Sequence, residues 1–452
     1  MSNSTTDLGK ESIGRLLLKL ATPSIIAQLV NVLYNIVDRI FIGRMQNGDV
    51  AMAGIGVAFP IVLLVSAFAA FVGMGGAPLA AIKMGEKDNN EAEKIMTNSF
   101  SVLLIIAGIL TVIFMIFKEP ILWKFGASES TIKYATDYLG IYLIGTVFVQ
   151  IALGMNPFVN TQGFAKIGMM TVTIGAIINI ILDPILIFGL NMGVKGAAVA
   201  TIVAQAVSAI WVLRFLTGKK TILKLRKKYL KIDIKTMKPV FALGIAPFIM
   251  QSTESLVLVS LNSQLQKYGG DLAIGAMTAI TSINLLFYMP VFGISQGMQT
   301  IIAYNYGAKQ FDRAKKALSI GMIGAIGILS LGLIATRLFP EILIGIFTKD
   351  ATLMELALNG ISIYSLTLPA VGICILGAVY FQSIGNAKMS IVLSLLRQVI
   401  VFIPLILLIP KLLGLNGVWA AQPLADIIST LIIVGFLIKE FKVDSVRELS
   451  YR

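Results

Sequence analysis

Long apolar runs, closed by charged residues or by glycine and proline, follow one another along the whole chain. A helix needs about 20 apolar residues to cross a bilayer, whereas strands of a membrane barrel show only about ten residues of alternating hydrophobicity. The runs are of the longer kind, so the pattern predicts an all-α integral membrane protein with twelve transmembrane helices. The expected spans are residues 14–43, 52–82, 95–117, 132–155, 166–190, 195–216, 239–266, 272–304, 316–339, 352–378, 389–410 and 416–438.

Composition agrees with this pattern and excludes several kinds of chemistry. The 452 residues are 57% hydrophobic and 13% charged, and the mean hydropathy is +0.87. There is no histidine and a single cysteine, Cys374. Histidine-based zinc sites, Ser-His or Cys-His catalysis and an intrachain disulfide are therefore excluded. We expect no enzyme and no cofactor.

The net charge of +14 is distributed as in a membrane protein and does not indicate a nucleic-acid partner. The only long basic connection, Arg214 to Lys238, follows the sixth run and reads as a cytoplasmic linker; a lipid-headgroup or regulatory site is the weaker alternative. With the N-terminus inside, most lysines and arginines fall on the cytoplasmic side, as the positive-inside rule requires. This predicts a multi-pass plasma (inner) membrane protein with both termini cytoplasmic.

The two halves of the chain resemble each other in their loops. At an offset of 222 residues, the segment 75–94 aligns with 297–316, and Gln162-Gly163-Phe164-Ala165-Lys166 aligns with Ile384-Gly385-Asn386-Ala387-Lys388. Two six-helix repeats enter the membrane in the same orientation and should enclose a central cleft. The predicted parts are an N-lobe (1–216), a basic linker (217–238) and a C-lobe (239–452).

One carboxylate, Asp38, lies deep in the first run. Gln28, Asn31, Asn35 and Asp38 recur at spacings of three and four, which places them on one helix face, with Tyr34 beside them. A carboxylate at the bilayer centre costs about 2.5–3.5 kcal/mol on insertion scales, so it normally faces a bundle interior or a water-filled cavity. The alternative is that Asp38 lies near the outer interface.

A second carboxylate, Asp183, is one helical turn from Asn179 in the fifth run, and Thr201 and Gln205 mark a polar stripe on the sixth. Together with Asp38 these side chains offer only oxygen and amide ligands, which suit a hard cation such as Na+ or a shared proton. The alternative is that Asp183 only ends a helix before the proline that follows it.

Comparison of the two halves favours a cation site in the N-lobe. At the offset of 222, Ser260 corresponds to Asp38 and Leu405 to Asp183, so the pair of acids exists in one half only. If these acids served only to hold the fold together, we would expect some trace of them at the corresponding positions of the other half.

Polar and aromatic residues inside the runs of both halves are candidates for a substrate cavity, and in the N-terminal runs these are Tyr34, Asn35 and Gln205. Glu254, with Tyr288 and Met289 in the next run, could contact a cationic substrate; the alternative is a structural Glu254 satisfied by Arg397 or by serines. Asp426 has no recognisable partner in the sequence. The roles of Asp426 and Arg397 stay open.

With these residues in place, the chain resembles the multidrug and toxic compound extrusion (MATE) transporters. The resemblance rests on the twelve runs in two repeats, the stretch YNIVDRIFIG around Asp38 and the long basic connection. Its most specific part is the set Asp38, Asn179, Asp183 and Thr201, which resembles the cation site of prokaryotic members. Pro23 falls where that subgroup has a proline at which the first helix is thought to bend.

The resemblance implies a secondary active antiporter that exports organic cations or drugs in exchange for H+ or Na+ by alternating access. It also implies a cation site at Asp38, Asn179, Asp183 and Thr201, a hinge at Pro23, and small cationic amphipathic molecules and membrane lipid as partners of a monomer. Glu254 matches an acid that another branch uses in its C-lobe, but the tenth run has no acid to accompany it. The alternative function is a flippase of lipid-linked precursors from the same superfamily.

Overall fold

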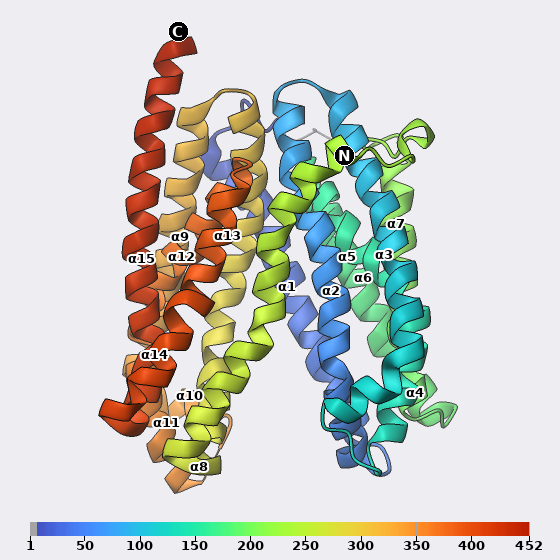
Figure 1. The fold of residues 1–452 in the computed structure, drawn as a ribbon, viewed down its shortest axis with the longest axis vertical. Coiled ribbons are helices and arrows are strands. Elements are labelled where there is room, and N and C mark those ends of the chain that lie inside the picture. The colour runs from blue at the N-terminus through green and yellow to red at the C-terminus, as the bar shows by residue number, and fades with distance from the viewer. Residues whose placement is uncertain (1–6, 349, 452) are drawn as a thin grey trace. The chain divides into compact units, whose positions relative to one another are not determined.

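The computed structural model describes residues 7–348 and 350–451, and these residues form helices without any strand. Nine helices are long and apolar enough to cross a membrane, and two bent pairs, α4–α5 (60°) and α11–α12 (53°), each add one span. The 74-residue α8 (Ile234–Gly307) leaves helical geometry at Gly270, where φ is +67°, so it supplies two spans. Twelve spans result in the described part of the chain, which confirms the predicted fold class (Figure 1).

The chain divides into two compact units. The first unit runs mainly over Ile26–Phe248, and the second contains Leu8–Ile25 and the chain from Ile249 onward. Besides part of α1 (Ile13–Gly43), the first unit contains α2 (Gly48–Gly85), α3 (Asn89–Lys124), α4 (Ile132–Ile144), α5 (Thr146–Thr161), α6 (Ala165–Pro184), the π-helical turn η1 (Ile185–Gly189), α7 (Val194–Leu216) and η2 (Lys227–Tyr229).

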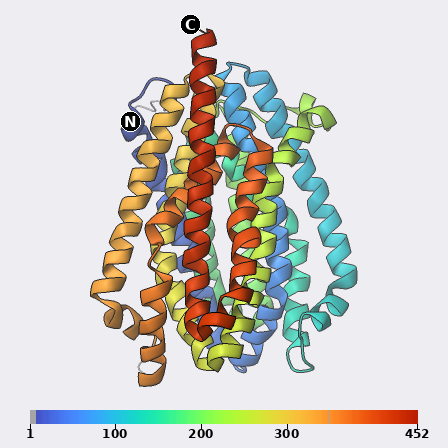
Figure 2. The same cartoon turned by 60° about the vertical axis from the view of Figure 1, so that its left-hand side comes forward.

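The second unit continues from α8 with a series of helices that ends in the long α15, drawn in dark red and seen along its length in Figure 2. These elements are α9 (Phe311–Leu338), α10 (Pro340–Gly345), α11 (Ala351–Tyr364), α12 (Leu368–Ser383), α13 (Ala387–Leu395), the π-helical turn η3 (Leu396–Phe402), α14 (Ile403–Leu408) and α15 (Pro410–Tyr451).

The units exchange the first segments of their first helices, which the repeat alone did not indicate. α1 begins in the second unit and passes into the first after Ile25, whereas α8 begins in the first and passes into the second after Phe248. The exchanged segments pack closely because glycines receive them. A Cβ on Gly75 of α2 would collide with the Val240 carbonyl, and one on Gly297 of α8 would lie 2.9 Å from the Ala21 nitrogen.

Gly297 follows Gly75 by 222 residues, so the glycines that receive the exchanged segments are repeat partners. Other irregularities also recur. The α4–α5 bend at Gly145 corresponds to the α11–α12 bend at Thr367. The described residues of each half also contain one π-helical turn, η1 or η3, although at the offset of 222 η3 corresponds to residues 174–180 and not to η1. The repeated backbone features agree with a duplicated six-helix fold.

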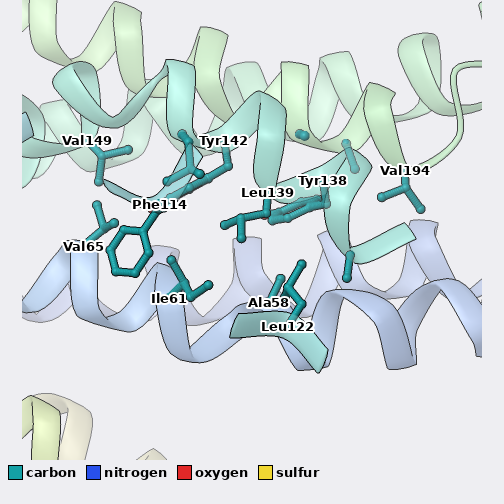
Figure 3. Packing of buried hydrophobic residues seen from close by; sticks show 14 of the residues in the cluster. Ala58, Ile61, Val65, Phe114, Leu122, Tyr138, Leu139, Tyr142, Val149 and Val194 are labelled. Carbon is teal, nitrogen blue, oxygen red and sulfur yellow. The ribbon is translucent and has the colours of Figure 1, made fainter. Parts of the chain in front are cut away.

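An apolar core positions α4 in the first unit. Ile61 and Val65 of α2 lie beside Phe114 of α3, and the Tyr138 and Tyr142 rings of α4 lie in the same cluster (Figure 3). Because this packing fixes one face of α4, it also fixes where the two tyrosine hydroxyls can reach.

The connection between the halves is bound to the first unit by buried polar side chains. The Gln162 Oε1 atom accepts hydrogen bonds from the Ile222 and Leu223 nitrogens and the Thr221 hydroxyl, at 2.7–2.8 Å. Glu93, 5% exposed, accepts from the Lys224 nitrogen at 3.0 Å. These buried acceptors replace water for the backbone of the connection, so the segment is ordered along its length.

Ion pairs on the same surface extend this attachment. Arg226 Nε lies 2.9 Å from Glu93, and Lys94 Nζ lies 2.6 Å from Asp233. The Lys94 ammonium, helped by the Lys235 backbone N–H and the Thr236 hydroxyl, lowers the pKa of Asp233 to about 2. Because the pKa is lowered on folding, the stabilisation is present above about pH 4 and is lost as the pH falls towards 2.

We predict that Gln162→Ala loosens the basic connection. It removes an acceptor of three hydrogen bonds, each worth roughly 0.5–1.5 kcal/mol net, so trypsin should cleave after Lys219, Lys220 or Lys224 about tenfold faster. The measurement is limited proteolysis of purified protein with cleavage sites identified by mass spectrometry. Gln46→Ala, at an exposed position of the same unit, is the control, and equal cleavage in both variants would contradict the prediction.

Candidate functional site

The two N-lobe acids meet in the interior of the first unit. Asp183 of α6 is 0% exposed and Asn179, one turn earlier, is 1% exposed. The Asn179 amide donates to Asp183 Oδ1 at 3.4 Å. From α1, the half-buried Asp38 brings its carboxyl close enough to the Asp183 carboxyl for the two to interact electrostatically. The structure thus brings together side chains that are more than 140 residues apart in sequence.

Local backbone geometry sets the position of Asp183. Pro184 ends α6 and has no N–H, and the chain continues as the π-helical turn η1 rather than as regular α-helix. π-Helical turns are frequent at functional sites because the extra residue redirects neighbouring side chains. Asp183 is thus an interior residue of a continuous span, not only the end of a helix.

Three oxygens of this cluster lack a hydrogen-bond donor. Asp38 Oδ1, Asp183 Oδ2 and Asn179 Oδ1 are all buried and unpaired. Buried polar atoms are normally hydrogen-bonded, and two adjacent carboxylates repel each other in a low-dielectric interior. A proton or a small hard cation between them would supply the missing positive charge.

Tyrosines surround the acid pair. Tyr34 of α1 lies within electrostatic range of Asp38 and Asp183. Tyr138 of α4 also lies within range of Asp38, and its hydroxyl lies beside the Thr201 side chain of α7. Tyr138 and Tyr142 stack with ring centroids 6.2 Å apart. The acid pair therefore lies beside a tyrosine wall, which is formed by the side chains of Tyr34, Tyr138 and Tyr142.

Sequence reasoning missed Tyr138 and Tyr142. The only available signal is their spacing of four residues, which stacks two aromatic rings on one helix face. That spacing does not show which helix the rings face. Thr201, 6% exposed, was predicted, and its side chain lies beside Tyr138, which in turn lies within electrostatic range of Asp38.

The predicted cavity residues are divided between the units. Asn35 is exposed, and Tyr34 and Gln205 are half-buried in the first unit. In the second unit Glu254 is exposed, whereas Tyr288 and Met289 are half-buried. No described residue forms an ion pair with Glu254. Their role in a substrate cavity stays a prediction.

The structure excludes one of the alternatives for Glu254 and gives Asp426 a partner. Arg397 does not satisfy Glu254, because its Nε atom lies 2.7 Å from Asp426 Oδ1. Asp426 consequently has a partner that the sequence did not reveal. The two residues belong to different elements, η3 and α15, and a one-dimensional pattern does not show which spans pack together.

Pro23 lies in the part of α1 that belongs to the second unit, three residues before the chain passes into the first. It is buried, and α1 stays helical from Ile13 to Gly43 around it. Because proline has no N–H, the Lys19 carbonyl lacks its helical donor, while the Ser24 hydroxyl donates to the Leu20 carbonyl at 3.0 Å. The turn around Pro23 therefore lacks one backbone hydrogen bond of the α1 helix.

Comparison with known proteins gives a consistent result. The MatE family model matches residues 23–185 and 245–408. The chain is 27% identical to the multidrug export protein MepA of Staphylococcus haemolyticus over 90% of both chains. It is also 27% identical to a protein of Shewanella oneidensis named FAD transporter, over 92% of both chains.

Solved structures share the fold. An outward-facing multidrug resistance MATE family transporter of the MOP superfamily matches with a TM-score of 0.90 at 22% identity, covering 98% of this chain and 99% of its own. A MATE structure described as the bent conformation matches with a TM-score of 0.92 at 22% identity over the whole of both chains. At this identity the match establishes the fold alone.

We predict that the acid pair makes thermal stability depend on Na+ or on protons. A ligand that binds only the folded state stabilises it by about 2.7 kcal/mol at a hundredfold excess over its Kd. Wild-type protein in detergent should therefore melt at higher temperature when Na+ is added at fixed pH, or when the pH is lowered without Na+. Asp38→Asn and Asp183→Asn should lose this response, and a response equal to that of wild type in both variants would contradict the assignment.

Proposed function

The chain belongs to the MatE family, and from this premise we propose that it is a secondary antiporter which exports amphipathic organic cations or drugs in exchange for H+ or Na+. Membership makes it a multi-pass membrane transporter rather than an enzyme. The observation that carries the coupling proposal is the Asp38–Asp183 pair, whose two buried, unpaired carboxylate oxygens lie with the unpaired Oδ1 atom of Asn179. We place both termini in the cytoplasm on the basis of the lysine and arginine distribution.

The acid pair would convert ion binding into movement. Without bound cation, two neighbouring carboxylates repel and favour a wider separation of α1 from α6. A proton or Na+ between them removes the repulsion and satisfies their unpaired oxygens, so the conformation with close carboxyls becomes the stable one. The ion gradient then biases the transporter towards the conformation that releases its cargo.

α1 is suited to transmit this change. Asp38 lies in the part of α1 that belongs to the first unit, and Pro23 lies in the part that belongs to the second. A bend near Pro23 costs little because that turn already lacks one backbone hydrogen bond. Ion binding at Asp38 can therefore alter the direction of one half of α1 without unfolding the helix.

The flippase alternative has less support. A flippase for a pyrophosphate-linked precursor would need several unpaired cationic groups within the spans. Only Arg39 and Arg397 lie well inside predicted spans, and the charge of Arg397 is balanced by Asp426, so the spans hold no cluster of uncompensated positive charge. MepA of Staphylococcus haemolyticus, named a multidrug export protein, supports drug export as the better proposal.

We predict that Asp38→Asn and Asp183→Asn each lower ion-driven export at least about tenfold, because asparagine keeps the side-chain size but cannot hold a proton or balance a cation. The measurement is efflux of ethidium from proteoliposomes under an imposed H+ or Na+ gradient at otherwise fixed composition. The gradient that drives efflux identifies the coupling ion.

Asp49→Asn, an exposed acid at the start of α2 in the same unit, is the matched control and should transport like wild type. Gradient-driven efflux that persists in well-folded Asp38→Asn and Asp183→Asn would overturn the coupling proposal.

We predict a different effect for Pro23→Ala. Alanine restores the missing backbone donor and stiffens α1, so efflux should slow several-fold while Na+- or proton-dependent stabilisation of the purified protein is retained. Comparing transport rate with the ion-induced melting shift separates the two steps. Unchanged efflux would exclude a hinge at this residue.

A further inference from the structure

The second unit contains a charged cluster of its own, built around Asp426 and Arg397. Asp426 of α15 is 2% exposed. Its Oδ1 atom accepts from Arg397 Nε at 2.7 Å and from Gln422 Nε2 at 3.0 Å. Its Oδ2 atom accepts from the Thr367 hydroxyl at 3.4 Å. The acceptor positions of Asp426 are thus occupied, in contrast to those of Asp38 and Asp183.

Arg397 is only partly used by this cluster. A guanidinium has five N–H donors, and the Asp426 bond engages the single one on Nε. No described residue accepts a hydrogen bond from either Nη atom, and the side chain keeps 22% of its surface exposed. The planar end with two NH2 groups is therefore available.

The surroundings of Arg397 also offer donors and aromatic surface. Tyr288 of α8 and Tyr364 of α11 lie within electrostatic range of both Arg397 and Asp426. Asn284, one turn before Tyr288 and 1% exposed, accepts from the Ser365 hydroxyl, but its Nδ2 donor is buried and unpaired. The unpaired groups near Arg397 are hydrogen-bond donors, whereas the unpaired groups at the acid pair of the first unit are acceptors.

The backbone holds Arg397 in place. It lies in η3, a π-helical turn, and the core around Phe402, Ile406 and Trp419 packs η3, α14 and α15 together. An arginine inside a transmembrane bundle normally faces the interior or a water-filled cavity. A guanidinium fixed at Nε and accessible at Nη has the geometry for bidentate binding of a carboxylate or a phosphate.

We propose that Arg397 recognises an acidic group of the exported molecule, with Asp426 as the residue that positions it. The substrate class is an amphipathic compound that carries a carboxylate or phosphate beside its apolar or cationic part. The inference deepens the proposed function and rests on it. A purely structural ion pair is the competing explanation, and it predicts no discrimination between substrates.

The test uses two dyes that differ in one group. Rhodamine 110 carries a free carboxylate, and rhodamine 123 is its methyl ester. We measure the Kd of each dye for purified protein by fluorescence anisotropy. Arg397→Gln should weaken rhodamine 110 binding about tenfold or more, because a hydrogen-bonded charge is lost, and leave rhodamine 123 within about twofold.

Arg397→Gln leaves the Asp426 carboxylate without its ion-pair partner, so this variant can fail to fold. Two further variants keep the proposal testable in that case. The double variant Arg397→Gln/Asp426→Asn removes both charges and should show the same selective loss. Arg397→Lys keeps the charge without the planar fork and should lose part of the rhodamine 110 affinity. Lys316→Gln, at an exposed position of α9 in the same unit, is the control and should change neither Kd.

Equal weakening of both dyes, or no weakening of either, in the folded double variant would overturn the proposal. Failure of the proposed function is distinguishable, because it would appear as absence of gradient-driven efflux by wild-type protein, irrespective of the two Kd values.

Discussion

A charge buried in a membrane protein must be compensated, and the two halves of this molecule meet that requirement in different ways. In the first unit, Asp38 and Asp183 share an environment with more acceptors than donors. In the second, Asp426 is satisfied by Arg397, Gln422 and Thr367. The cost of burying charge therefore creates a demand for a cation in the first unit, whereas in the second unit the charges balance and the Nη donors of Arg397 stay available.

The duplicated backbone explains how two differently charged clusters can occur in two halves of similar fold. Both halves keep a bent span, a π-helical turn and a glycine that receives the exchanged segment. These features depend on backbone shape, which tolerates side-chain change. The acids and the arginine depend on side chains alone, so each half could acquire its own charged residues without loss of the fold.

The sequence predicted the features that leave a periodic or compositional trace. The spans follow from hydrophobic length, and the association of Asp38 with Asp183 followed from the asymmetry between the repeats. The Arg397–Asp426 pair, the tyrosine wall and the packing of the basic connection were not predicted. They depend on which helices are neighbours, and neighbours in a helical membrane protein are chosen by close packing of small residues rather than by a pattern within one helix. Gln162, for example, looks like an ordinary loop residue in the sequence. In the structure it is 1% exposed and accepts three hydrogen bonds.

The exchange of helix segments has a consequence for biosynthesis. The Leu8 carbonyl accepts hydrogen bonds from Asn305 and Arg313, and Arg313 also donates to the Glu11 carbonyl at 2.8 Å. The ribosome must therefore complete about three hundred residues before the segment that leads into α1 can form these hydrogen bonds. The segment Leu8–Ile25 therefore reaches its final packing only with the second unit, although it is the part of that unit that is synthesised first.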